Sequence, residues 1–154
     1  NEKKERVKDA VGATKAAIEE GIIPGGGVAL LRARRSLTKV TSSDKDEQVG
    51  IDIVRAALEE PLRWLVKNAG EDDGYVLKKI EEQADSDYGY NVMTGEFGSM
   101  MKFGILDPLK VTRSALQNAA SVAMMVLTTE ALVTELPSEE KSVTPAMPGG
   151  GMDY

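Results

Sequence analysis

A run of three glycines, Gly25, Gly26 and Gly27, is the feature of this 154-residue chain best suited to contact a ligand. Glycine adopts positive φ angles without strain and has no side chain, so the backbone at such a turn can approach a bound group closely. A helical pattern resumes directly after the run, and backbone N–H groups at the start of a helix favour phosphates and other anions. The turn therefore predicts a phosphate or nucleotide contact. A flexible joint between two helices is the alternative interpretation.

The side chains available for acid–base chemistry are restricted, because the chain contains no histidine and no cysteine. The commonest general base and metal ligand is missing, and so are thiol nucleophiles, disulfides and thiolate metal sites. Proton transfer must therefore use Asp, Glu, Lys or Tyr. The phosphate loop G-x-x-x-x-G-K-[ST] does not occur in the sequence, which argues against an autonomous ATPase of that class.

Composition and charge indicate a globular domain with a sizeable core, since 42% of the residues are hydrophobic and 29% are charged. The net charge of −6 argues against nucleic acid or an anionic membrane as the main partner. No apolar run approaches the roughly 18 to 20 residues that a membrane span needs, and the start shows no secretory signal pattern. Because the first residue is Asn1 and not methionine, we expect the chain to be a piece of a longer polypeptide.

Helical periodicity predicts a mainly α protein. Apolar residues at i, i+3, i+4 and i+7 spacing predict a first helix over 1–20 with Gly21 after its end. We expect further helices over 27–37 and 61–68, and a long helix that starts at Pro108, whose many small residues imply close approach to neighbouring helices. Two other stretches carry helical apolar patterns: Val49, Ile53, Val54, Ala57 and Leu58, and then Val76, Leu77 and Ile80.

The helical spacing of apolar residues is interrupted between Ile80 and Pro108. The segments 88–93 and 96–100 flank Thr94-Gly95, which predicts a small β-hairpin. Trp64 is expected to pack in the core. The stretch 131–136 either finishes the long helix or forms a strand, and the Ser-, Pro-, Gly- and charge-rich residues 137–154 predict a disordered tail.

Several longer motifs occur along the chain in a fixed order. They are residues 5–10 (ERVKDA), 13–21 (ATKAAIEEG), 25–30 (GGGVAL), 57–63 (ALEEPLR), 68–70 (NAG), 88–91 (YGYN), 104–108 (GILDP) and 110–123 (KVTRSALQNAASVA). Together these motifs closely resemble the C-terminal part of group I chaperonins, the GroEL-type folding machines, over nearly everything from 1 to 137. The resemblance implies a multihelical fold with a small β-hairpin, the C-terminal half of a chaperonin equatorial domain.

The resemblance also implies a domain organisation. Residues 1–20 would be the returning helix of the intermediate domain, 21–136 the C-terminal half of the ATP-binding, ring-forming equatorial domain, and 137–154 the tail. The triphosphate loop, the acidic magnesium ligand and the apical domain would belong to the rest of the parent chain. The implied cofactors are ATP and magnesium, with no metal ligand in this chain. The implied partners are identical subunits in a double heptameric ring, a co-chaperonin and unfolded client proteins. Bacterial cytoplasm is the expected location, with the mitochondrial matrix or plastid stroma as alternatives.

Site residues carry over from the chaperonin motifs position by position. Asp9 matches the aspartate that positions or deprotonates the attacking water, and its alternative is a solvated surface carboxylate. Gly26 matches the glycine whose backbone meets the nucleotide. Asn91, Val92 and Met93 match the lining of the adenine pocket, where an amide and main-chain groups read the base; simple structural packing is the alternative.

Four further residues complete the set. Asp107 matches the carboxylate that binds the ribose hydroxyls, and a helix N-cap role is an alternative compatible with it. Gly21 matches the hinge between the intermediate and equatorial domains. Arg63 and Asp72 lie near positions that resemble inter-ring contacts, although exposed ion pairs contribute little.

The resemblance therefore implies part of an ATP-dependent, isomerase-class protein-folding subunit. The isolated chain is expected to be inactive, because it lacks the triphosphate and metal ligands. The alternative function is a stand-alone helical scaffold or oligomerisation module without ATPase activity.

Overall fold

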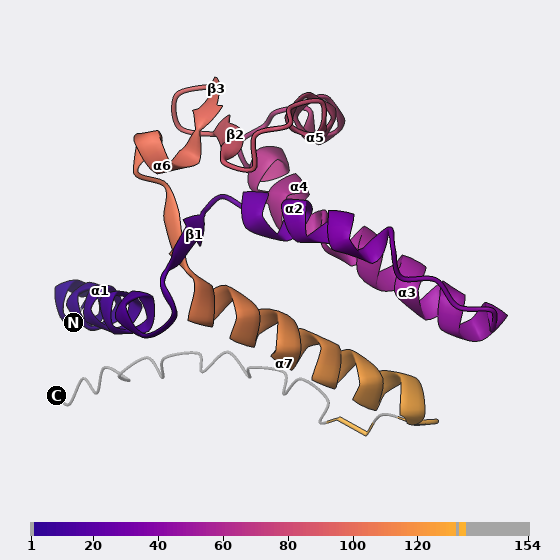
Figure 1. Ribbon diagram of the computed structural model, residues 1–154. Helices are drawn as coiled ribbons and strands as arrows, with labels where there is room; N and C mark the ends of the chain where they lie inside the picture. The colour runs from indigo at the N-terminus through magenta and orange to yellow at the C-terminus, as the bar shows by residue number, and fades with distance from the viewer. Residues whose placement is uncertain (1, 132, 135–154) are drawn as a thin grey trace, which may run out of the picture.

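Helices dominate the computed structural model, which describes residues 2–131, 133 and 134 (Figure 1). The first half contains α1 (Glu2–Glu20), β1 (Ile22–Pro24), α2 (Val28–Leu37), α3 (Lys45–Ala57), α4 (Glu60–Asn68) and α5 (Asp73–Glu81). The second half contains β2 (Tyr88–Asn91), β3 (Glu96–Ser99), α6 (Met100–Phe103), β4 (Leu106–Pro108) and α7 (Leu109–Thr128). The predicted mainly α fold with a β-hairpin is confirmed. No helix in the described part of the chain is both long and apolar enough to cross a membrane.

Local capping chemistry sets several helix starts. The Asp44 carboxylate accepts two backbone N–H groups in the first turn of α3, and the Asp72 carboxylate accepts the N–H of Tyr75 at 3.0 Å at the start of α5. Pro61 occupies the first turn of α4, where its missing N–H costs no hydrogen bond. The predicted helix over 61–68 therefore starts one residue earlier than expected.

The hydrophobic core lies between α2, α4, α5 and the β2–β3 hairpin. Its buried members are Leu31, Leu62, Val66, Val76, Leu77, Ile80 and Tyr90. Phe97 of the hairpin packs against this cluster, and its ring centroid lies 4.6 Å from that of Tyr90. The hairpin thus packs against the core through the aromatic side chains of Tyr88, Tyr90 and Phe97.

Trp64 does not belong to the core, and the expectation that it packs there is wrong. Leu62 and Val66 occupy the buried side of α4, four residues apart, and Trp64 falls between them on another face of the helix. Its side chain is 59% exposed, and the Lys67 ammonium lies 5.6 Å from the ring centroid.

A second two-stranded sheet, not expected from the sequence, joins β1 to β4. The strands are antiparallel, with Ile22 opposite Pro108, Ile23 opposite Asp107 and Pro24 opposite Leu106. Figure 1 shows them side by side between α1 and α7 on one side and the remaining helices on the other. Three-residue strands so far apart in the chain have too few residues to show the alternation by which strands are predicted.

Helix α7 packs only partly against its neighbours. Ser114 and Ala115 line a groove between α7 and α1, but the small residues within 119–123 are exposed, so the predicted close approach holds only for the first part of this helix. The part from Val122 to Leu127 is instead exposed. The helix ends at Thr128 and does not reach Ala131, so it is not continued by the stretch 131–136; residues 132 and 135–154, including the predicted tail, lie outside the described residues.

Candidate functional site

The glycine turn between β1 and α2 is closely packed. The Gly25 N–H donates to the Ile105 carbonyl at 2.9 Å. Gly26 has a φ of +65°, and a Cβ at this position would lie 2.8 Å from Met100 Cε. Gly27 has a φ of +78°, and its Cβ would lie 2.7 Å from the Leu62 backbone nitrogen. These contacts argue against a flexible joint, and they show that the protein's own backbone and side chains already require glycine here.

Asp107 is a half-buried carboxylate that the β1–β4 pairing holds opposite Ile23, beside the glycine turn. Desolvation by burial raises the pKa of Asp107, and no hydrogen bond or positive charge from the described residues offsets it. The alternative N-cap role is wrong, because Pro108 occupies that position of α7 and no side chain caps the helix. Desolvating a carboxylate without a protein donor costs free energy, and groups with such perturbed pKa values cluster at functional sites.

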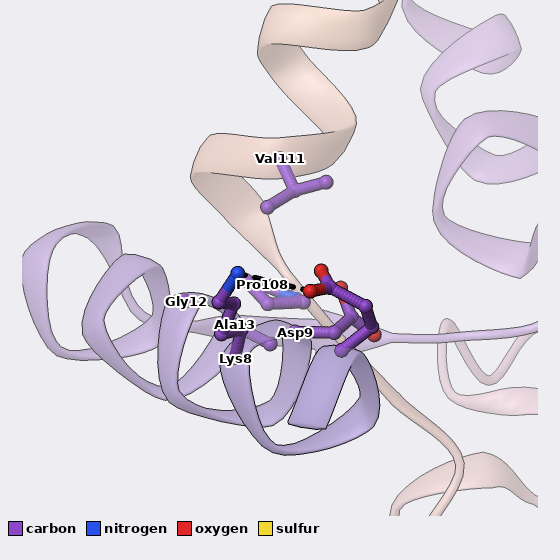
Figure 2. Close-up of a pocket in the computed structure, with 7 residues that line it drawn as sticks. Lys8, Asp9, Gly12, Ala13, Pro108 and Val111 are labelled. Atoms are coloured by element: carbon purple, nitrogen blue, oxygen red, sulfur yellow. Dashed lines mark hydrogen bonds and ion pairs between the residues drawn. The ribbon is translucent and has the colours of Figure 1, made fainter. Parts of the chain in front are cut away.

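Asp9 lies on the side of α1 that faces the start of α7. A cavity of about 470 Å³ separates the two elements, and its lining is Glu5, Lys8, Asp9, Gly12, Ala13, Pro108 and Val111. Figure 2 shows the α1 residues of this lining beneath Val111, with Pro108 behind them. Because Pro108 directly follows Asp107, the fold brings the two carboxylate-bearing segments to one region.

The three hairpin residues differ in their surroundings. The Asn91 side-chain oxygen accepts the N–H of Met93 at 3.0 Å, so the amide nitrogen is the group that Asn91 can offer as a donor. Val92 packs against the core cluster, as the structural-packing alternative predicted for this segment. Met93 is 89% exposed at the tip of the hairpin.

Met100 joins the hairpin to the glycine turn, and sequence reasoning missed it. It is fully buried. A Cβ on Gly89 of β2 would lie 2.6 Å from Met100 Sδ, and one on Gly26 would lie 2.8 Å from Met100 Cε. The backbones at Gly89 and Gly26 therefore both pack closely against the Met100 side chain. The flexible thioether of methionine suits such an irregular gap, but no sequence pattern marks a methionine for this role.

One comparison with known proteins identifies the chain at this point. A sequence model of the TCP-1/cpn60 chaperonin family matches residues 1–137. The chain belongs to this family. The predicted resemblance is thereby confirmed, and the match includes every site residue named above as well as every helix and strand of the described fold.

In this chaperonin chain, Gly21 lies where α1 meets β1, with a φ of +88°. Its carbonyl accepts the N–H of Leu109 at 3.1 Å. The preceding Glu20 receives two hydrogen bonds from Arg113, at 2.6 and 3.0 Å, and these bonds lower the pKa of Glu20. Glu19 pairs with Lys110. Helix α1 is thus tied to α7 immediately before the residue predicted to be the hinge.

Arg63 and Asp72 are not brought together. The Arg63 guanidinium lies 2.6 Å from Asp73 and 2.7 Å from Glu59, and hydrogen bonds to these two carboxylates raise the pKa of Arg63. Asp72 is occupied as the N-cap of α5. Both residues have partners within the chain, and their contact between chaperonin rings stays a prediction.

The described residues hold no group of three or more acidic side chains placed to bind a metal ion. Asp9 lines the cavity from α1, whereas Asp107 belongs to β4 and directly precedes Pro108, which lines the cavity from the other side.

Proposed function

We propose that this chaperonin chain forms the base and ribose side of an ATP site within a longer, ATP-driven protein-folding subunit. The observation that carries the proposal is the half-buried Asp107 carboxylate, for which the described residues supply no hydrogen-bond donor. The two ribose hydroxyls of a nucleotide are the donors that would satisfy it. A stand-alone scaffold would be more stable with a neutral side chain at this position, so the scaffold alternative leaves Asp107 unexplained.

The glycine turn and the hairpin supply the rest of the nucleotide contacts. Gly26 presents main chain without a Cβ, two residues before the start of α2 and next to the strand that pairs with β4. Asn91 offers its amide nitrogen to an acceptor on the adenine edge, and the exposed Met93 gives the base apolar cover. Val92 acts by holding the hairpin on the core.

Asp9 is the group proposed to act on the attacking water. It lines the cavity together with Pro108, which follows the proposed ribose ligand Asp107, and we propose that the phosphates of the bound nucleotide extend into this cavity. A carboxylate can orient a water molecule for attack on a γ-phosphoryl group, while charge on the phosphates is stabilised by other groups. These other groups belong to the remainder of the proposed subunit.

Movement about Gly21 would couple the site to the shape of the subunit. Rotation at this residue, with release of the Glu19–Lys110 and Glu20–Arg113 pairs, would carry α1, and with it Asp9, away from the start of α7. We propose that the subunits assemble into a homo-oligomeric double ring and that clients and a co-chaperonin bind through a separate apical domain. A bacterial cytoplasmic location remains our preferred assignment.

The proposal is tested by the affinity of the complete subunit for ATP and for 2′,3′-dideoxy-ATP, which lacks the ribose hydroxyls. The unsubstituted subunit should bind ATP more tightly by about tenfold or more, since hydrogen bonds to a charged group contribute about 1.5–3 kcal/mol. Asp107→Ala should bind both nucleotides equally and weakly. Asp46→Ala, which removes an exposed carboxylate on α3, is the matched control and should behave as the unsubstituted subunit does. Equal affinities in the unsubstituted subunit would refute the ribose contact.

A further inference from the structure

Arg32 of α2 binds a set of backbone carbonyls that joins α5 to the β2–β3 hairpin. Its Nη2 lies 2.6 Å from the Asp85 oxygen, 3.1 Å from that of Ile80 and 3.4 Å from that of Tyr88, and its Nη1 lies 3.0 Å from that of Gln83. One guanidinium therefore holds the end of α5, the connecting loop and the first residue of β2. Arginine suits this because its planar group presents several donors in fixed directions.

The same face of α2 contacts the hairpin a second time. Val28 lies four residues before Arg32, so the two side chains project from neighbouring points on the helix. Val28 is fully buried, and a Cβ on Gly89 would lie 2.6 Å from Val28 Cγ2. Strand β2 is thus fixed to α2 by packing at Gly89 and by a charged hydrogen bond at Tyr88.

This attachment relates two parts of the proposed nucleotide site. Helix α2 begins directly after the glycine turn, with Gly27 as its N-cap. Strand β2 ends at Asn91, whose side chain projects to the same side of the strand as residue 89 because strand side chains alternate. The position of Asn91 relative to Gly26 therefore depends on how β2 is held against α2.

We propose that Arg32 is a positioning residue for the base end of the site, and that it sets Asn91 at the correct distance from Gly26. This inference rests on the proposed function. Arg32 does not touch the nucleotide; it acts through the carbonyls of Asp85 and Tyr88.

Arg35 provides a matched comparison on the same helix. Its Nη2 lies 3.1 Å from the Glu81 oxygen and 3.3 Å from that of Gln83, so it too binds carbonyls at the end of α5. Neither bond reaches Asp85 or Tyr88. If capping of α5 were the whole role of these arginines, substitution of either would have the same consequence for the nucleotide site.

The experiment compares Arg32→Met, Arg32→Lys and Arg35→Met in the complete subunit, with ATP and inorganic triphosphate as ligands in competition against a fluorescent ATP analogue. Triphosphate shares the phosphates of ATP but has no base or ribose. Arg32→Met should weaken ATP about tenfold and raise the KM for ATP hydrolysis by a similar factor, with little change in triphosphate affinity or kcat. Arg32→Lys should be intermediate, because one ammonium group reaches fewer of the carbonyls. Arg35→Met should leave both affinities unchanged.

Each result has a distinct meaning. Equal losses of ATP and triphosphate binding in Arg32→Met, or identical effects of Arg32→Met and Arg35→Met, would show a structural role only and overturn the inference. Unchanged ATP binding in Arg32→Met would overturn it as well. If the unsubstituted subunit binds ATP no better than triphosphate, the proposed base and ribose contacts are refuted. The proposed role of Arg32 is then refuted as well, because it depends on those contacts.

Hydrogen exchange in the isolated chain gives a readout that needs no nucleotide. In Arg32→Met the amides of β2 and β3 should exchange faster than in the unsubstituted chain, while those of α4 keep their protection. In Arg35→Met both sets should keep their protection. Unchanged exchange of β2 and β3 in Arg32→Met would contradict the claim that this arginine holds the hairpin, whatever the subunit binds.

Discussion

The Asp107 carboxylate lies opposite Ile23 in the β1–β4 pair, and burial there raises its pKa without a compensating partner from the described residues. The pairing places Asp107 against the apolar strand β1, and this burial disfavours the charged form of the carboxylate. It also places the carboxylate beside the Gly25–Gly27 turn. The cost of holding the charge and the proposed binding function therefore have the same structural cause.

Neutralising Asp107 should stabilise the chain at neutral pH. Because the pKa is raised on folding, the folded state binds this proton more tightly than the unfolded state does. Stability contributed by the neutral form is complete below the unfolded pKa of about 4 and is lost as the pH rises through the folded pKa. Asp107→Asn removes this loss, so its melting temperature should exceed that of the unsubstituted chain at neutral pH. The difference should shrink below about pH 4.

Thermal melting of the isolated chain at several pH values checks this, with Asp46→Asn as the control for removal of an exposed charge. A melting temperature for Asp107→Asn at or below that of the unsubstituted chain at neutral pH would mean that burial does not destabilise the charged carboxylate.

Gly26→Ala should destabilise the chain even without a nucleotide. The φ of +65° disfavours any residue with a Cβ, and the added atom would lie 2.8 Å from Met100 Cε. A residue other than glycine held in such a backbone conformation typically lowers the free energy of unfolding by about 1–3 kcal/mol. Gly50→Ala is the matched control, because nothing lies within 4 Å of its Cβ position in α3. That substitution should stabilise the helix by about 0.5–1 kcal/mol.

Chemical denaturation measures both changes. In the Met100→Ala background the cost of Gly26→Ala should fall, since the clashing atom is gone, but the cost of the positive φ remains. A Gly26→Ala chain as stable as its parent would show that the turn is looser than its contacts indicate. This result also bears on nucleotide assays, because lost binding in a Gly26 variant must be corrected for the fraction that remains folded.

The elements predicted well from the sequence are those with long periodic patterns or strong caps. Helix α1, with its repeating apolar positions, lies where expected, and α3 contains all but the last residue of the apolar pattern from Val49 to Leu58. The hairpin around Thr94-Gly95 was also predictable from its turn residues. Trp64 was placed wrongly, because a hydrophobic residue type does not reveal which face of a short helix is buried.

The candidate site was predictable only through the chaperonin resemblance. Asp9 and Asp107 carry no distinctive spacing, and the β1–β4 pairing that places Asp107 is a long-range contact between very short strands. Arg32 and Met100 were missed for a related reason. Their roles depend on the three-dimensional approach of α2, the hairpin and α6, which no local pattern encodes.

The exposed end of α7 should make the isolated chain self-associate. Val122 and Val126 lie four residues apart on one side of this helix and are 54% and 67% exposed. Contiguous apolar surface of this kind binds hydrophobic dyes and favours association. The double substitution Val122→Lys/Val126→Lys should reduce both dye fluorescence and the mass measured by light scattering. An unsubstituted chain that is strictly monomeric and binds no dye would contradict this expectation.

The isolated chain should not hydrolyse ATP. It contains the proposed water-directing Asp9 and the base and ribose contacts. Stabilisation of phosphate charge dominates phosphoryl transfer, however, and we expect the triphosphate and magnesium ligands to belong to the rest of the parent subunit. Phosphate release by the purified chain with magnesium and ATP should equal that of an Asp9→Ala chain prepared in the same way. Turnover above that control would show that the chain contains a more complete site than proposed.

The central claim is that Asp9 acts on water at a nucleotide site built around Asp107. Single-turnover ATP hydrolysis in the complete subunit tests it most directly, with ATP affinity measured in parallel. Asp9→Ala should lower the hydrolysis rate by about a hundredfold or more and leave ATP affinity nearly unchanged, since loss of a general base or water-orienting group costs on the order of 10²–10⁴ in rate. Asp107→Ala should instead weaken ATP binding. Hydrolysis by Asp9→Ala at the unsubstituted rate, or a loss of ATP affinity as large as that of Asp107→Ala, would contradict the account.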